Sequence, residues 1–145
     1  MEELTVEAQT ENLPEVLSFL TRRLEELGCQ PKVQRQIEIA AEEIFVNIAH
    51  YAYPQTEIPR AQASGSATVR FSVEEGTAVI TFIDSGVPYN PLAKPDPDLT
   101  LPAQKRPIGG LGIYMVKKSM DEMSYDYRDG QNILTIKKKI EAHGS

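Results

Sequence analysis

The chain has 145 residues, 41% of them hydrophobic and 25% charged, a length and composition typical of one soluble globular domain. Its formal net charge of -6 at pH 7 argues against direct binding to nucleic acid or to an anionic membrane surface, because both attract basic proteins. The single cysteine, Cys29, excludes a disulfide within the chain and is typical of a reducing compartment.

No segment has the character of a targeting signal or of a membrane anchor. The N-terminal residues are acidic and alternate in polarity, unlike a secretory signal peptide. No apolar run approaches the ~20 residues that cross a bilayer as a helix. We therefore expect a cytoplasmic protein in which residues 1–145 form a single domain.

The first part of the chain predicts a strand followed by two helices. Residues 4–8 alternate between apolar and polar side chains, as a strand does. A helix is predicted from Asn12, its expected N-cap, to Gly28. A second helix is predicted to begin at Pro31 and to end before Pro54.

Two strands and a proline-rich segment follow a loop. The predicted strands, residues 68–74 and 77–83, are joined by a turn at Glu75-Gly76. The second is apolar or β-branched at almost every position, which favours a central strand covered on both faces. Residues 86–110 contain six prolines and show no periodicity, which is typical of a functional lid or of disorder.

The end of the chain predicts one more helix and two strands. The helix begins at a glycine-rich sequence, residues 109–112, and the strands are joined by a turn at Asp129-Gly130. The order is therefore strand, two helices, two strands, lid, helix, two strands. This grouping indicates an α+β fold, a two-layer α/β sandwich with helices on one face of a mixed sheet.

Polar residues border the apolar stripe of the second predicted helix. Glu43 and Asn47 lie one turn apart, and His50 follows on much the same side. An amide oxygen suits Mg²⁺, which usually takes only one or two protein ligands besides phosphate and water. A carboxylate nearby can orient or deprotonate a nucleophile near a γ-phosphate. The alternatives are a surface residue for Asn47 and a helix-end packing residue for His50, to which we assign no chemistry.

The sequence Asp84-Ser85-Gly86 directly follows the apolar strand. A carboxylate at this position can accept a hydrogen bond from an exocyclic amine, and a glycine lets a flat ring approach the backbone. An ordinary turn between strand and loop explains the same residues.

The sequence Gly109-Gly110-Leu111-Gly112 opens the third predicted helix. Backbone N–H groups at such a start can converge on phosphate oxygens, and the helix dipole adds positive potential. A hinge explains it as well. The sequence is not a P-loop, because no Lys-Ser/Thr follows, and it is not a Rossmann fingerprint, because no strand precedes it.

The order and spacing of these motifs resemble those of the GHKL ATPase superfamily with its Bergerat ATP-binding fold. Within it the chain looks most like the anti-sigma-factor serine kinases of the RsbW type. The resemblance is carried by residues 40–54, 82–92 and 108–138, and so covers nearly the whole chain.

The resemblance implies a role for each motif around ATP and Mg²⁺. Asn47 would coordinate the Mg²⁺ that bridges the phosphates, and Glu43 would act as general base toward a serine hydroxyl. Asp84 would accept a hydrogen bond from the adenine amino group, with Gly86 beside the base. The phosphates would be held by Gly109, Gly110, Leu111 and Gly112.

Three further residues have less defined expectations. Lys105 and Arg106 would reach phosphate or a partner, or would be solvated loop charges. The family often has Gly-Thr in the last hairpin, with the threonine near the nucleotide. This chain has Gly130-Gln131-Asn132 instead, so Asn132 is a candidate for a polar contact to the nucleotide.

The resemblance implies an ATP-dependent serine kinase and anti-sigma factor in a partner-switching pathway. Its partners would be a STAS-domain anti-anti-sigma protein and a sigma factor, and a homodimer through an edge strand carrying Leu4, Val6 and Ala8 is a further conjecture. One alternative is a module that binds ATP and a partner without transfer. Another is a detached ATPase domain of the histidine-kinase type.

Overall fold

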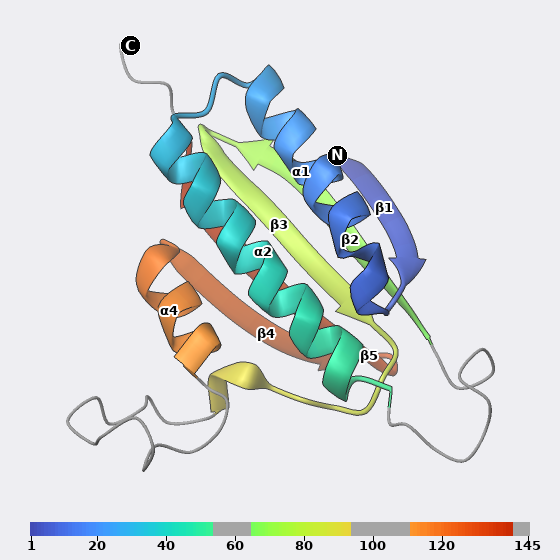
Figure 1. The fold of residues 1–145 in the computed structure, drawn as a ribbon. Coiled ribbons are helices and arrows are strands. Elements are labelled where there is room, and N and C mark those ends of the chain that lie inside the picture. Colours follow the sequence, from blue (N-terminus) through green and yellow to red (C-terminus); the bar gives the residue numbers. More distant parts are fainter. Residues whose placement is uncertain (54–64, 94–110, 141–145) are drawn as a thin grey trace.

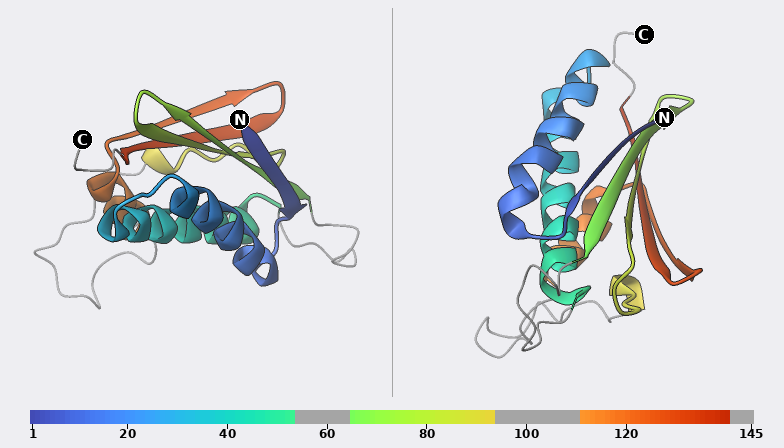
Figure 2. Two further views of the ribbon diagram at one scale, coloured as in Figure 1. Left: turned by 90° about the horizontal axis from the view of Figure 1, so that it is seen from above. Right: turned by 90° about the vertical axis from the view of Figure 1, so that its right-hand side faces the viewer.

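The computed structural model describes residues 1–53, 65–93 and 111–140 (Figure 1). The chain forms two layers, a five-stranded sheet and a layer of α-helices on one of its faces (Figure 2). In chain order the elements are β1 (Glu2–Glu7), η1 (Thr10–Asn12), α1 (Leu13–Glu26), α2 (Pro31–Tyr51), β2 (Ser66–Glu74), β3 (Thr77–Asp84), η2 (Pro91–Ala93), α4 (Leu111–Ser119), β4 (Glu122–Arg128) and β5 (Gln131–Lys139). The predicted order of elements and the α+β sandwich are confirmed.

The strand order is β1-β2-β3-β5-β4, and all four neighbouring pairs are antiparallel. The expectation of a mixed sheet is therefore wrong for the described strands. Both β3 and β4 are antiparallel to β5, so they run in the same direction, but β5 lies between them. The two hairpins turn at Glu75-Gly76 and Asp129-Gly130, where all four residues have positive φ, as in the type I′ turns that suit tight hairpins.

The core lies between the helices and one face of the sheet. From Thr77 to Phe82 the burial of β3 alternates, and Val79 and Thr81 on the other face are only half-buried, although Ile83 near the end of the strand is buried. The expectation that β3 is covered on both faces is therefore wrong for most of the strand, because β-branched residues also suit an open sheet face. The largest fully buried side chains are Phe45, Phe82, Leu20, Leu24, Ile37, Ile44, Ile80, Ile136, Val16, Val69 and Val116.

The first strand is at the edge of the sheet, but its apolar side chains belong to the core. Val6 and Ala8 are buried in the main hydrophobic cluster, and Leu4 packs against it. Val6 and Ala8 are therefore not available for a homodimer contact, and Leu4 is only partly exposed. A dimer through β1 would have to use its backbone edge, and such a dimer remains a conjecture.

Two of the predicted helix boundaries are confirmed and one predicted cap is wrong. Pro31 occupies the first turn of α2, and α1 ends just before Gly28, which has φ +69°. Asn12 does not cap α1 through its side chain. Its Nδ2 donates instead to Glu7 O at 2.9 Å, because the chain makes a 3-10 turn before the helix.

Of the predicted lid, residues 86–110, the structure describes residues 86–93, which include η2. Pro54, the expected stop of the second helix, lies outside the described residues. Among the helices that the structure describes, none combines the length and the apolar character needed to cross a membrane.

Candidate functional site

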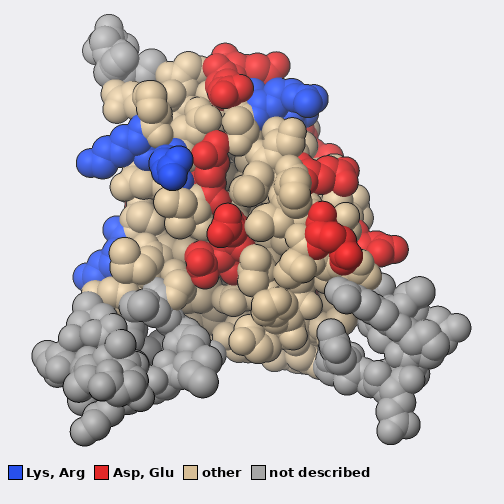
Figure 3. Space-filling view, viewed as in Figure 1, with Lys and Arg blue, Asp and Glu red and all other residues tan. Residues whose placement is uncertain are grey.

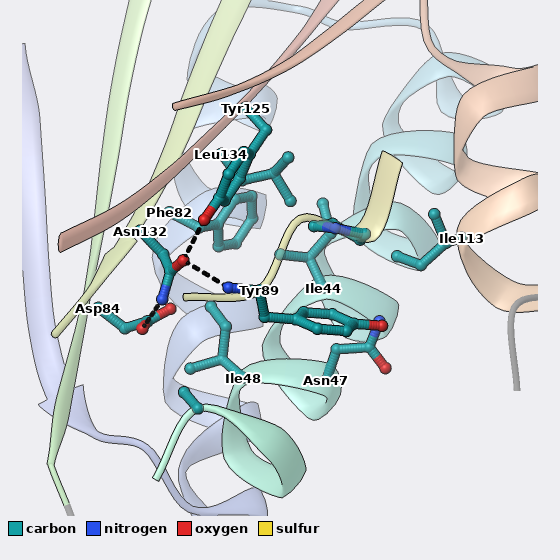
Figure 4. A pocket seen from close by; sticks show the side chains of 12 residues that line it. Ile44, Asn47, Ile48, Phe82, Asp84, Tyr89, Ile113, Tyr125, Asn132 and Leu134 are labelled. Atoms are coloured by element: carbon teal, nitrogen blue, oxygen red, sulfur yellow. Dashed lines mark hydrogen bonds between the residues drawn. The ribbon is translucent and has the colours of Figure 1, made fainter. Parts of the chain in front are cut away.

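A cavity lies where the C-terminal half of α2 faces the ends of β3 and β5 (Figure 4). The first turn of α4, a tyrosine of β4 and the segment after β3 complete its walls. The lining residues are Ile44, Asn47, Ile48, Ala52, Phe82, Asp84, Tyr89, Pro91, Ile113, Tyr125, Asn132 and Leu134. An apolar cavity with a few polar groups is the usual form of a small-molecule site.

The cavity is small as it stands, because an aromatic ring lies across it. Its volume is about 40 Å³, which suits a water molecule and not a purine. Figure 4 shows the ring of Tyr89 extending across the cavity toward Asn47. The ring centroid of Tyr89 lies 6.0 Å from that of Tyr51 at the end of α2. A nucleobase therefore enters only if Tyr89 or a neighbouring wall residue moves.

Helix α2 presents Glu43 and Asn47 on the side next to its buried stripe. Ile44 and Ile48 face the core, and the two polar residues are half-buried beside them. Asn47 lines the cavity, whereas Glu43 lies one turn away, against α4. A Cβ atom added to Gly112 would lie 2.1 Å from Glu43 Oε2. The absence of a side chain at Gly112 therefore lets the Glu43 carboxylate lie against the first turn of α4.

Asp84 is the buried carboxylate of the site, with 6% of its surface exposed. Its Oδ1 accepts hydrogen bonds from the Gly86 N–H and from Asn132 Nδ2, both at 2.9 Å. Burial raises the pKa of Asp84, and the two hydrogen bonds act in the opposite direction. The carboxylate is thus held at the end of β3 by donors from two different segments.

Gly86 lies against the end of α2. The Val87 N–H donates to Ala52 O at 2.8 Å, and a Cβ atom at Gly86 would lie 2.1 Å from the same oxygen. Close packing against Ala52 thus explains why a glycine occupies position 86. Its expected place beside the base remains a prediction, since Gly86 is not among the residues that line the cavity.

Sequence reasoning missed three tyrosines that support this region. Tyr53 accepts a hydrogen bond from the Ser85 N–H at 2.8 Å and donates to Ser66 O at 2.6 Å. Tyr125 donates its hydroxyl to Asn132 Oδ1, and the Tyr89 N–H donates to the same oxygen at 3.0 Å. The alternation of β4 places Tyr125 on the inner face, where a hydroxyl needs a partner, and this was an available signal.

The remaining predicted residues divide between the described and undescribed parts of the chain. Lys105, Arg106, Gly109 and Gly110 lie outside the described residues, and Leu111 is described only as the first residue of α4. His50 is exposed at the end of α2, and its ring makes an edge contact with Tyr51, with 6.1 Å between centroids.

The described residues offer few metal ligands. They contain no group of three or more His, Cys, Asp or Glu residues placed to hold a metal ion. The Asn47 side chain at the cavity fits a Mg²⁺ that takes most of its ligands from phosphate and water.

A two-layer α+β domain with a carboxylate in an apolar cavity and a Glu/Asn pair on the adjacent helix has the architecture of a GHKL-type ATPase domain. The sequence model of the family described as histidine kinase-like ATPase domain matches residues 6–138. The chain belongs to this family, and the resemblance found in the sequence is confirmed.

The chain is also similar to bacterial proteins named serine-protein kinase RsbW. Identity is 29% over 105 residues to the protein of Bacillus mycoides (strain KBAB4) and 30% over 105 residues to that of Bacillus cereus (strain B4264). In both cases the match covers 70% of this chain and 61% of the relative. The match thus spans about three-fifths of the length of these relatives.

Two solved structures share the fold. One contains the RsbU and RsbW domains of a Mycobacterium tuberculosis protein, with a TM-score of 0.61 and 15% identity over 99% of this chain and 34% of that chain. The other is the histidine kinase AdeS of Acinetobacter baumannii, with a TM-score of 0.51 and 13% identity over 98% of this chain and 70% of that chain.

Proposed function

We propose that this protein is an ATP-dependent serine kinase of the anti-sigma-factor type, acting on a STAS-domain anti-anti-sigma protein. The observation that carries the proposal is the contact between the half-buried Glu43 and the first turn of α4, one helical turn from Asn47 at the cavity. This arrangement brings a carboxylate, an amide ligand and a helix start to one side of the cavity.

Once Tyr89 or a neighbouring wall residue has moved, the cavity would suit the base of ATP. Its walls are mostly apolar, and Asp84 at its end can accept a hydrogen bond from the adenine amino group. A base that presents a carbonyl at that position would meet the carboxylate with an acceptor and would be rejected. Asp84 therefore favours adenine over guanine.

The phosphates would extend from the cavity toward α4. Asn47 would hold Mg²⁺, and residues 109–112 would supply backbone N–H groups at the start of the helix. Mg²⁺, when bound, neutralises phosphate charge during transfer. The chain itself supplies position, because phosphoryl transfer depends mainly on alignment and charge stabilisation.

Glu43 would act as general base toward the serine hydroxyl of the partner. It is half-buried and lies against Gly112, so its carboxylate stays near the expected phosphate position. The relatives named serine-protein kinase RsbW support a serine as the acceptor. The STAS-domain partner, and alternately a sigma factor, are what the resemblance of the sequence to anti-sigma-factor kinases implies.

The second candidate is a module that binds ATP and a partner but transfers nothing. The same contact also fits a binding module, because a carboxylate packed on a helix start can stabilise that helix without taking part in any chemistry. The two functions differ in one measurable respect, which is the appearance of phosphate on the partner.

The test uses the full chain, γ-labelled ATP, Mg²⁺ and a STAS-domain partner recovered by pull-down. We expect label on the partner, and a loss of roughly 10²–10⁴-fold in Glu43→Gln with ATP binding retained, as for removal of a general base. Glu42→Gln is the matched control, because Glu42 is the exposed neighbour on the same helix. An unlabelled partner would favour the binding module, and equal loss of ATP binding in Glu43→Gln would make Glu43 structural.

A further inference from the structure

We propose that Asn132 is a positioning residue that orients the Asp84 carboxylate for the purine and makes no contact with the nucleotide itself. This inference rests on the proposed function, because it concerns how the same cavity recognises adenine. It replaces the direct contact between Asn132 and the nucleotide that the sequence indicated.

The argument begins with the hydrogen bonds of Asn132. A carboxamide has two N–H donors and two acceptor lone pairs. Nδ2 donates to Asp84 Oδ1 and to Val87 O, both at 2.9 Å. Oδ1 accepts from the Tyr89 N–H at 3.0 Å and from the Tyr125 hydroxyl (Figure 4). All four positions are therefore used within the protein.

Because Asn132 is buried, exchanging any of these hydrogen-bond partners would cost free energy. The residue is 6% exposed, and a buried polar group that loses its partner is strongly penalised. A direct bond to a nucleotide would require Asn132 to release Asp84, Val87, Tyr89 or Tyr125. The Asn132 side chain therefore keeps its hydrogen bonds within the protein when a nucleotide binds.

The sheet register explains why Asn132 acts on Asp84. The two residues are directly opposite each other on β5 and β3, with both side chains on the helix-covered face. Asp84 Oδ1 accepts from Asn132 and from Gly86, and no described residue donates to Oδ2. The arrangement therefore leaves Oδ2 as the oxygen available to an exocyclic amine.

The same amide also holds the chain that follows β3. Val87 and Tyr89 belong to this segment, and Tyr125 reaches the amide from β4. Asn132 thus connects the Asp84 carboxylate, the edge strand β4 and Tyr89, whose ring crosses the cavity. Removing its donor should disturb the direction of the carboxylate more than the apolar walls.

The experiment measures binding of ATP and of purine riboside triphosphate, which lacks the 6-amino group, by calorimetry with Mg²⁺. The wild-type chain should prefer ATP. Asn132→Leu should lose about 10-fold to 100-fold in ATP affinity and little for the analogue, the effect of losing a hydrogen bond to a charged group. Asn132→Thr, which keeps a hydroxyl donor, should recover part of the preference. Thr135→Val, on the opposite face of β5, should change neither affinity.

Two controls separate positioning from other roles. Combining Asn132→Leu with Asp84→Ala should weaken ATP binding no further than Asp84→Ala alone, because the residues act as a unit. If Asn132→Leu does not fold, Tyr125→Phe keeps the ring and removes one partner of the amide, and it should lower the preference in the same direction.

Equal losses for ATP and for the analogue, or multiplied losses in the double variant, would show direct contact or general damage and would overturn the inference. Retained preference in Asn132→Leu, or in Tyr125→Phe where that is the folded variant, would do the same while leaving the proposed function intact. Failure of the wild-type chain to bind ATP would overturn both.

Discussion

Asp84 combines burial with two protein donors, and this combination sets both its acidity and its use. A buried carboxylate without donors would take up a proton, whereas Asn132 and Gly86 favour the charged form. Burial remains the larger effect and raises the pKa of Asp84. The residue is therefore costly for folding and suited to accepting a hydrogen bond from a ligand, as functional residues often are.

We expect Asp84→Asn to raise stability at pH 7 and to abolish the preference for ATP. The pKa of the Asp84 carboxyl is raised in the folded chain. At pH values between the ordinary pKa of an Asp carboxyl and this raised pKa, the folded chain binds more protons than the unfolded chain. Stability therefore falls as pH rises through this range. The neutral amide lacks this penalty. Thermal unfolding should show a gain at pH 7 that shrinks as pH falls toward 4, and an equal loss at both pH values would contradict the assignment.

The sequence indicates Asp84 because an Asp-x-Gly after an apolar strand is visible locally. It does not indicate that Asn132 holds Asp84, because the two are 48 residues apart and meet only through the register of β3 and β5. The alternation of β4 placed Tyr125 on the inner face, but its partner Asn132 could not be predicted, since it lies on the neighbouring strand.

At the scale of elements, α2 connects the two ends of the site. Its C-terminal end meets the turn after β3, where Gly86 lies against Ala52, and its middle meets α4, where Glu43 lies against Gly112. Both contacts need a glycine, but they differ in what an added side chain would strike. One is a backbone oxygen, and the other is the end of a flexible side chain.

We expect Gly112→Ala to lower transfer and to leave the fold intact. The added Cβ would displace the Glu43 carboxylate, whose Oε2 lies 2.1 Å from its position, and a misplaced base can cost about 10²-fold in rate. The free energy of unfolding should change by no more than about 1 kcal/mol, because alanine favours the helix. Unchanged transfer would mean that Glu43 need not lie against α4.

Gly86→Ala should instead damage the fold around the cavity. Its Cβ would lie 2.1 Å from Ala52 O, so the backbone must shift, and we expect a loss of about 1–3 kcal/mol in urea unfolding. Ser85→Ala, at the exposed neighbouring side chain, is the matched control. Stability equal to that of the control would show that the turn and α2 can separate freely.

The order of the elements could be predicted because turns, prolines and apolar periodicity are local signals. Both hairpin turns and the start of α2 at Pro31 are of this kind. The direction of β4 relative to its neighbours and the open face of β3 are not, because they depend on which strands pair. The predicted cap at Asn12 is wrong because a 3-10 turn precedes α1 and the Asn12 side chain bonds to Glu7 O instead.

At the scale of the whole molecule, one sheet face carries the helices and the site, and charge is distributed unevenly over them. Acidic side chains run along the face formed by α1 and α2, while lysine and arginine side chains lie mainly near its margins (Figure 3). With a net charge of -6, this face suits a partner that presents basic residues, and its association should weaken as salt rises.

The account depends on a single purine nucleotide bound between α2 and the sheet. The most direct test is a calorimetric titration of the full chain with ATP and Mg²⁺, beside the same titration of Asp84→Ala. We predict saturable binding of one ATP per chain, and a markedly weaker affinity for ATP in the variant. No uptake of adenine nucleotides by the wild-type chain, even with a partner protein supplied, would contradict the account.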